Sequence, residues 1–326
     1  PFGTQIPYEE KDLKVVGTNP SARPDAVDKV TGKARYAADI NLPGQLIGKV
    51  LRSPHAHANI KSIDTSKAEK LKGVKAVVTQ DDFPDMAVLH AAAGEMIVNF
   101  RDVTRTMMAR EKVLFDGHPV AAVAATSESV AKAALKLIKV DYEVLPHVID
   151  VVEAMKPDAP LLNEEQFTKG VEPAPEKPSN IAAQMTSKLG DVDEGFKQAD
   201  LVVEREFNTK AAHQGYIEPH ASLAIYTEGG NAEVWTSTQG HFLIRAQLAK
   251  VLEMDVSRIK VTPAELGGGF GGKNSIYLEP LAIILSKKSG RPVKMVMTRD
   301  EVFRASGPTS GTNIIIKIGV TKDGMI

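Results

Sequence analysis

Five glycines lie within six positions in the stretch "AELGGGFGGKN", which covers residues 264–274. We call residues 267–272 the glycine run. Each glycine held in one conformation costs about 0.5–1 kcal/mol relative to alanine, so the run gives up a large share of the roughly 5–15 kcal/mol that stabilises a domain. Two glycines suffice for most tight turns. With the ring of Phe270 in its middle, the run predicts close approach of the backbone to a bulky, electron-rich ligand.

Two nucleotide-binding motifs fit the glycine run only in part. The first and last glycines and Lys273 satisfy most of the P-loop pattern G-x-x-x-x-G-K-[ST], but Asn274 stands where a hydroxyl side chain should hold magnesium. The glycines also match the dinucleotide pattern G-x-G-x-x-G, yet Pro280 would break the helix that this pattern requires. A P-loop-like nucleotide-binding protein is therefore kept as an alternative function.

Composition limits the possible partners. Of the 326 residues, 43% are hydrophobic and 25% charged, which is typical of a globular chain with two domains. Lys and Arg number 40 against 41 for Asp and Glu, so we expect no nucleic-acid partner. No apolar run is long enough to span a membrane, and the first residues lack a secretory signal, which favours the cytoplasm. Since the chain has no cysteine, any iron–sulfur relay must lie on another chain.

The glycine run and the upstream "STQ" (Ser237–Gln239) resemble the molybdenum subunit of the xanthine dehydrogenase and aldehyde oxidase family. "DKVTGKARYAADI", "VLRSPHAHANI" and "VDYEVLP" are similar to its α/β-hammerhead domain, and "HQGYIEPHASLAIY" to the start of its molybdopterin-binding domain. The likeness is greatest to bacterial split or hydroxybenzoyl-CoA-reductase-like members. It implies an α+β fold that divides into an N-terminal extension (1–21), a hammerhead domain (22–146), a surface connection (147–180) and the first, incomplete part of a molybdopterin-binding domain (181–326).

The resemblance also implies the chemistry. In this family a water-derived oxygen is inserted at an electron-poor carbon, and hydride passes to a molybdenum sulfido ligand. Electrons then leave to iron–sulfur clusters and FAD on partner chains. The implied cofactor is molybdopterin, as the molybdenum form or its cytosine dinucleotide, which holds the metal through its dithiolene rather than through protein ligands. We expect three partners, namely an iron–sulfur subunit, an FAD subunit and either a second molybdopterin-binding chain or a C-terminal remainder. The family's catalytic glutamate is expected on that last part, so the chain alone should be inactive.

The resemblance assigns roles near the cofactor. Gln239 matches a glutamine that donates a hydrogen bond to an oxygen ligand of molybdenum, which a carboxamide can do without adding charge. Phe270 would form a wall of the substrate pocket, and the backbone N–H of Gly271 would donate to a molybdenum oxygen. Gly268 and Gly269 would let the loop close in on the cofactor.

Asn274 departs from the family pattern. Purine-oxidising members carry a glutamate there, and a site that lacks a required polar partner rejects the corresponding substrate. The implied substrate is an aldehyde, an N-heteroaromatic compound or an aryl-CoA rather than xanthine. A cofactor-free paralogue that acts as a scaffold is a further alternative.

Hydrophobic patterns place these residues on a framework. In the first half they predict strands at residues 46–53, 74–80 and 120–125. A helix over 126–140, with Thr126 as its N-cap, and a strand over 140–146 follow, an order typical of a crossover connection. His55 and His57 lie two apart on a predicted strand, so their side chains should point the same way as an H-x-H metal site or a buried pair.

The second half shows a similar mixture. We predict a strand over 199–207, a hairpin over Gly229–Gly230, a helix over 241–254 and a strand over 258–265 that enters the glycine run. A helix that begins near Tyr277 should end at Gly290. A strand over 313–320 leads into a Lys-Asp-Gly turn that calls for a returning strand, so we expect the fold to continue on further polypeptide.

Overall fold

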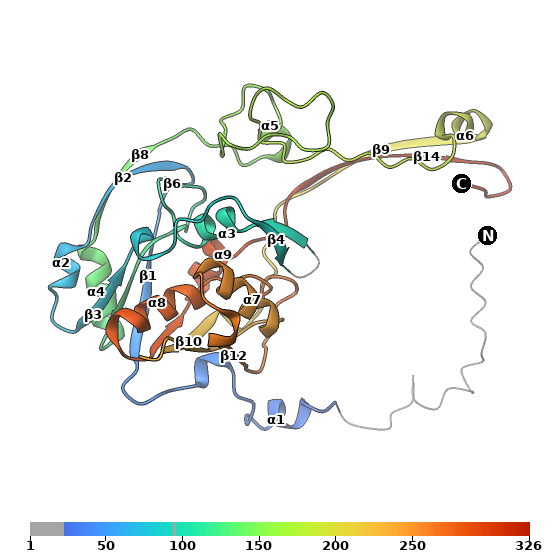
Figure 1. Ribbon diagram of the computed structural model, residues 1–326. Helices are drawn as coiled ribbons and strands as arrows, with labels where there is room; N and C mark the ends of the chain where they lie inside the picture. The colour runs from blue at the N-terminus through green and yellow to red at the C-terminus, as the bar shows by residue number, and fades with distance from the viewer. Residues whose placement is uncertain (1–22, 94–95) are drawn as a thin grey trace.

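The computed structural model describes residues 23–93 and 96–326. Its centre is a seven-stranded mixed sheet (Figure 1). The strands, in spatial order, are β12 (Ile259–Pro263), β11 (Ala232–Thr236), β10 (Ala221–Tyr226), β13 (Val293–Val296), β1 (Leu46–Arg52), β7 (Pro119–Ala125) and β3 (Val74–Val78). The predicted strands of both halves and the hairpin of β10 and β11 are present, which confirms the mixed α and β class.

The main sheet crosses between the two halves of the sequence. β1 pairs in parallel with β13, with Leu46 opposite Val293, and so joins three strands from the first half to four from the second. One hydrophobic cluster likewise contains Phe100 from the first half and Leu285 from the second. Because this sheet is continuous, the glycine run that follows β12 is positioned by strands from both halves.

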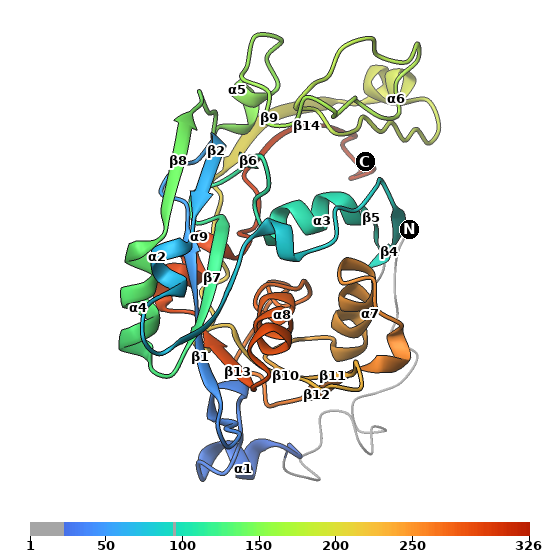
Figure 2. The same ribbon diagram turned by 60° about the vertical axis from the view of Figure 1, so that its left-hand side comes forward.

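Helices cover both faces of the sheet (Figure 2). α3 (Phe100–Met107), α7 (His241–Val251) and α8 (Glu279–Ser289) lie on one side, and α2 (Ser66–Glu69) and α4 (Glu128–Leu137) lie on the other. Alternate residues of β7 belong to the two clusters, Ala122 and Ala124 to the larger one and Ala121 and Val123 to the smaller. β7 is therefore buried on both faces, which explains its uninterrupted apolar sequence.

The topology after β7 differs from the predicted crossover. β8 (Lys139–Val144) does not return to the main sheet but pairs antiparallel with β2 (Ala58–Asp64), which also pairs with β6 (Lys112–Val113). The N-cap of α4 is Ser127, whose hydroxyl accepts a hydrogen bond from the Val130 N–H, and not the predicted Thr126. The order of elements was right, but their partners depend on contacts that local patterns do not encode.

The remaining elements surround the main sheet. They are α1 (Ala26–Val30), η2 (Ala37–Asp39), η3 (Gln80–Asp82), β4 (His90–Ala93), β5 (Met96–Asn99), α5 (Val151–Ala154), α6 (Val192–Gln198), β9 (Leu201–Thr209), η4 (Val256–Arg258), α9 (Arg299–Ala305) and β14 (Thr312–Val320). β9 and β14 form a two-stranded ribbon that projects from the body and carries α6 near its far end (Figure 1). None of the helices in the described part of the chain has the length and apolar character needed to cross a membrane.

Candidate functional site

Four of the five glycines are packed against the protein's own side chains. A Cβ on Gly267 would lie 2.6 Å from the Cβ of Glu218, and a Cβ on Gly269 would lie 2.5 Å from Oε1 of Gln239. A Cβ on Gly268 would lie 3.0 Å from Cβ of Tyr216, and a Cβ on Gly272 would lie 2.9 Å from Cε1 of the same residue. The prediction that a ligand demands the bare backbone is thus incomplete, because internal packing alone excludes side chains at these positions.

The fourth glycine lies on the open side of the loop. The Gly272 N–H donates to the Gly269 carbonyl at 2.7 Å, which closes a tight turn around Phe270 and Gly271. These two central residues have φ angles of +50° and +85°, as in type I′ turns. A phenylalanine is strained in this conformation, whereas glycine is not, yet the Phe270 side chain is 73% exposed. Residues with strained backbone angles cluster at functional sites.

Gln239 is anchored to this turn through its oxygen. Its Oε1 accepts from the backbone N–H of Gly271 at 2.9 Å and of Lys273 at 3.3 Å. The backbone N–H of Gln239 donates to the Lys273 carbonyl at 3.1 Å, and so does the Thr238 hydroxyl at 3.0 Å. With the oxygen fixed, Nε2 of this exposed residue remains as a donor without a partner among the described residues. The Gly271 N–H, which the resemblance assigns to a molybdenum oxygen, donates to Gln239 here.

A buried ion pair lies beneath the loop. The Lys273 ammonium, whose side chain is fully buried, donates to Oε2 of Glu218 at 2.7 Å and to its backbone carbonyl at 3.0 Å. The same Oε2 accepts from the Gly267 N–H at 2.8 Å, so the pair fixes both ends of the glycine run. Burial lowers the pKa of Lys273, and the carboxylate of Glu218 opposes that shift. Lys273 is therefore a structural residue and not a free anion ligand.

Aromatic and histidine side chains surround this pair. The Tyr216 ring lies 4.8 Å from the Lys273 ammonium, and its hydroxyl is 2.6 Å from Nε2 of His220 and 3.0 Å from the Ser306 hydroxyl. Burial, and secondarily the charge of Lys273, lower the pKa of His220 to about 3. The imidazole of His220 is thus neutral at physiological pH. It supports the loop from behind through Tyr216.

The geometry contradicts the nucleotide-binding alternative. Both nucleotide motifs place the phosphates at the N-terminus of a helix that starts directly after the glycines. Here turns and bends follow the run, and α8 begins only at Glu279, with Pro280 in its first turn. Pro280 thus starts this helix rather than interrupting one. With Lys273 paired to Glu218 as well, the run lacks both groups that would hold a phosphate.

The structure brings four of the predicted residues to one surface. Gln239, Phe270, Gly271 and Asn274 are all exposed and lie on the loop or directly against it. Asn274 is fixed through its backbone, since its carbonyl accepts from Nε2 of Gln247 at 3.0 Å. Gly268 and Gly269 lie behind this surface, where they pack against Tyr216 and Gln239. An open surface with one directed amide donor and one aromatic ring can form a wall of a cofactor site.

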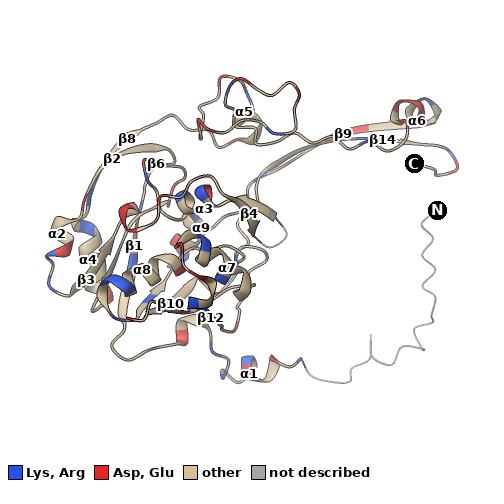
Figure 3. Cartoon of the chain, viewed as in Figure 1, with Lys and Arg blue, Asp and Glu red and all other residues tan. Residues whose placement is uncertain are grey.

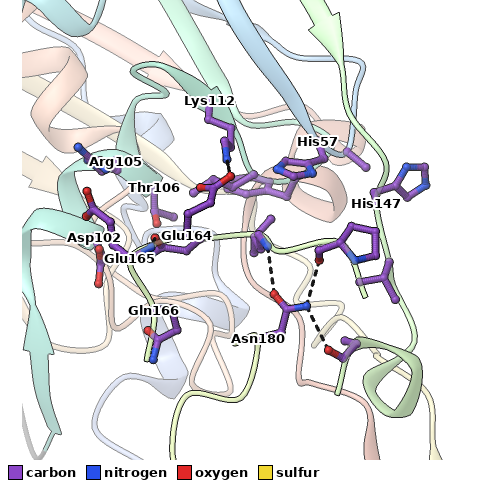
Figure 4. Close-up of a pocket in the computed structure, with 18 of the residues that line it drawn as sticks. His57, Asp102, Arg105, Thr106, Lys112, His147, Glu164, Glu165, Gln166 and Asn180 are labelled. Carbon is purple, nitrogen blue, oxygen red and sulfur yellow. Dashed lines mark hydrogen bonds and ion pairs between the residues drawn. The ribbon is translucent and has the colours of Figure 1, made fainter. Parts of the chain in front are cut away.

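A separate cavity of about 950 Å³ lies between α3, residues 110–116 and the connection 147–182 (Figure 4). Lys112 and Glu164 form an ion pair at its edge, and the side-chain Nδ2 of Asn180 ties the connection together by donating to the backbone carbonyls of Ala154 and Pro160. His57 is buried there with Nδ1 2.8 Å from the Pro146 carbonyl. His55 and His57 lie in the loop between β1 and β2 and not on the predicted strand. Within residues 23–93 and 96–326, no cluster of three or more histidine or acidic residues could hold a metal ion.

Sequence and structure comparisons place the chain among known proteins. The family described as "Aldehyde oxidase and xanthine dehydrogenase, a/b hammerhead domain" matches residues 31–146, and the family described as "Molybdopterin cofactor-binding domain" matches residues 173–326. The "Nicotinate dehydrogenase large molybdopterin subunit" of Eubacterium barkeri is 32% identical over 316 residues, which are 97% of this chain and 69% of that protein. The chain belongs to the xanthine dehydrogenase and aldehyde oxidase family of molybdopterin-binding subunits.

Other family members are longer than this chain. A probable xanthine dehydrogenase subunit of Bacillus subtilis is 35% identical over 302 residues, which are 93% of this chain but 38% of that protein. The structure of a CO dehydrogenase from Oligotropha carboxidovorans superposes with a TM-score of 0.78 at 32% identity, over 93% of this chain and 37% of that one. The chain thus spans less than two fifths of the length of these two relatives. The hammerhead domain and the molybdopterin-binding domain follow one another in the predicted order.

The ion pair of Lys273 and Glu218 can be tested by a mutant cycle. Lys273→Met leaves the carboxylate of Glu218 buried without a counter-charge, so we expect the free energy of unfolding to fall by about 3–5 kcal/mol. Adding Glu218→Gln removes the charge but keeps an acceptor for the Gly267 N–H, and should recover much of the loss. Chemical denaturation measures both effects. As a control, Lys197→Met removes a lysine from an exposed pair with Glu194 and should change stability by less than about 0.5 kcal/mol. A double variant no better than Lys273→Met would contradict the electrostatic explanation.

Two buried histidines predict a pH dependence of stability. Burial lowers the pKa of His220 to about 3 and that of His118 to about 4, from the ordinary 6.5. Between pH about 6.5 and about 4 the unfolded chain therefore binds more protons than the folded one. Stability should fall as the pH falls through this window, by about 1.4 kcal/mol per pH unit for each histidine. Denaturation at pH 7, 6 and 5 measures the slope. His220→Phe should reduce it, and an unchanged slope would exclude His220 as a cause.

Proposed function

We propose that this chain forms the hammerhead domain and one wall of the cofactor site in a molybdenum hydroxylase of the xanthine dehydrogenase and aldehyde oxidase family. The observation that carries the proposal is the exposed surface of Gln239, Phe270 and Gly271. There the amide oxygen of Gln239 is held by two backbone N–H groups, and its Nε2 donor has no partner among the described residues. These three residues lie in the segment that matches the cofactor-binding domain family, which supports this assignment.

The residues present fit a molybdopterin cofactor. Bound there, the cofactor would supply the oxygen transfer and accept two electrons from the substrate. The Nε2 group of Gln239 would donate to an acceptor atom of the cofactor without adding charge to the site. The ring of Phe270 would exclude water from one side of the substrate. Gly271 leaves room for a close approach, since a Cβ at this residue would have none of the described atoms within 4 Å.

The substrate and the partners follow from the same assignment. Asn274 stands where a glutamate would grip a purine, so we propose an aldehyde, an N-heteroaromatic compound or an aryl-CoA as the substrate. The nicotinate dehydrogenase relative supports the N-heteroaromatic class. The catalytic glutamate and most contacts to the pterin, in the molybdenum or cytosine dinucleotide form, would come from further polypeptide. An iron–sulfur subunit and an FAD subunit would carry the electrons onward, in the cytoplasm.

Metal analysis of the native assembly tests the proposal. The complex that contains this chain is purified from its source, and its molybdenum and iron contents are measured by elemental mass spectrometry. We expect molybdenum together with several irons per complex. An intact complex without either metal would favour the alternative of a cofactor-free scaffold.

Substitutions at Gln239 separate its two roles. Gln239→Glu keeps an oxygen that accepts from the Gly271 and Lys273 N–H groups but replaces the outward donor by an acceptor. We expect kcat to fall roughly 100-fold, as for the loss of one preorganised donor, with an unchanged unfolding midpoint. Gln239→Ala should lower kcat similarly and also loosen the loop. Steady-state kinetics and thermal unfolding measure the two effects. Full turnover in both variants would remove Gln239 from the site.

Asn274→Glu tests the assignment of the substrate class. A carboxylate at this exposed position should favour a purine over the native substrate by about 10–100-fold in the ratio of kcat/KM values, the effect of one charged hydrogen bond. Molybdenum content should stay the same. Asn274→Gln serves as a control that keeps the neutral amide. A parallel loss of molybdenum and activity in Asn274→Glu would show that the residue holds the cofactor instead.

A further inference from the structure

The ribbon of β9 and β14 has two chemically different faces. Residues directly opposite one another in an antiparallel pair lie on the same face, and the register pairs Phe207 with Ile314 and Val203 with Ile318. One face therefore carries Leu201, Val203, Arg205, Phe207, Ile314, Ile316, Ile318 and Val320, with the pair of Thr209 and Thr312 at its end. We call this set the ribbon face. Seven of its ten side chains are apolar, two are threonines, and Arg205 is its single charge.

The opposite face is mostly polar, with Val202 and Ile315 as its apolar side chains, and it is already partly covered. Asn313 donates to Glu206 across the strands at 2.6 Å. A Cβ on Gly319 would lie 3.1 Å from the Phe196 ring of α6, and the Lys317 ammonium lies 5.0 Å from the centre of the same ring. α6 thus packs on the polar side. Among the described residues it leaves the ribbon face uncovered.

Exposure of so many neighbouring apolar side chains is unusual on the surface of a folded domain. Six of the seven apolar side chains on the ribbon face are exposed, and most of the ribbon carries no charge (Figure 3). One largely apolar face opposite one largely polar face is typical of an antiparallel sheet with one buried side. A two-stranded ribbon is at best marginally stable in water, and contiguous apolar patches mark interaction sites. The ribbon face therefore needs a partner surface.

We propose that the ribbon face docks onto the further molybdopterin-binding polypeptide of the large subunit, on an apolar surface that offers a carboxylate to Arg205. Both strands lie within the match to the cofactor-binding domain family, and relatives of this chain carry additional polypeptide, since the chain spans 37% of the CO dehydrogenase subunit. A second copy of this chain is a poorer occupant. Packing two ribbon faces together would bury an arginine from each chain without a counter-charge.

Single cysteines provide a direct test, because the chain has none of its own. Ile316→Cys places a thiol on the ribbon face, and Ile315→Cys places a matched thiol on the opposite face one residue away. In the structure their side chains are 41% and 66% exposed, which would allow similar labelling if nothing covered the ribbon. In the purified native assembly, we expect maleimide to label Cys at position 315 at least ten times faster than at 316. Equal rates would overturn the proposal.

A photoactivatable maleimide on the Ile316→Cys variant identifies the occupant. Crosslinks to large-subunit polypeptide outside residues 1–326 are expected, whether that polypeptide is on the same chain or a separate one. Crosslinks from one copy of β14 to another, or to the iron–sulfur or FAD subunit, would refute this occupant. The inference rests on family membership and not on the proposed activity. If the assembly lacked molybdenum but the thiol of the Ile316→Cys variant were protected from labelling, the proposed activity would be wrong and the docking inference would stand.

Discussion

The buried ion pair of Lys273 and Glu218 is the contact on which the candidate site depends. Oε2 of Glu218 binds the Lys273 ammonium and the Gly267 N–H, and thereby holds both ends of the glycine run. The backbone of Lys273 in turn binds Gln239 through its N–H and its carbonyl. One pair thus fixes the loop and the amide that faces away from it. Desolvation of such a pair is costly, so its geometry must be maintained by the packing around it.

That packing comes from the sheet that the two halves share. Gln239 follows β11 and the glycine run follows β12, and these two strands are parallel neighbours. Because parallel strands have their carboxyl ends on the same side of the sheet, both loops leave from the same end of these two strands. Glu218 precedes β10, the antiparallel neighbour of β11, so it reaches the same end. β13 and its parallel pairing with β1 extend the sheet into the first half and hold these strands in one continuous sheet.

Local patterns predicted the elements better than their partners. The helix α8 ends at Ser289 with Gly290 as its C-cap at a φ of +64°, because a left-handed cap favours glycine wherever it occurs. The route of β8 to a second sheet was missed, since strand pairing depends on residues far apart in sequence. The same holds for the site. The family likeness indicated Gln239 and Phe270, but the packing of Gly267 against Glu218 joins residues about fifty positions apart, and no spacing rule connects them.

The described part of the chain buries its apolar side chains in some places and exposes them in others. β7 is buried on both faces, between the two hydrophobic clusters that the helices cover. Phe270 and the ribbon face, by contrast, expose apolar side chains, and both belong to the part that matches the cofactor-binding domain. The strained turn at Phe270 persists because Gly269 and Gly272 close it by a hydrogen bond and Gln239 holds it from the side. The chain thus gives up stability to present apolar side chains on its surface, and we propose that a cofactor and further polypeptide contact them.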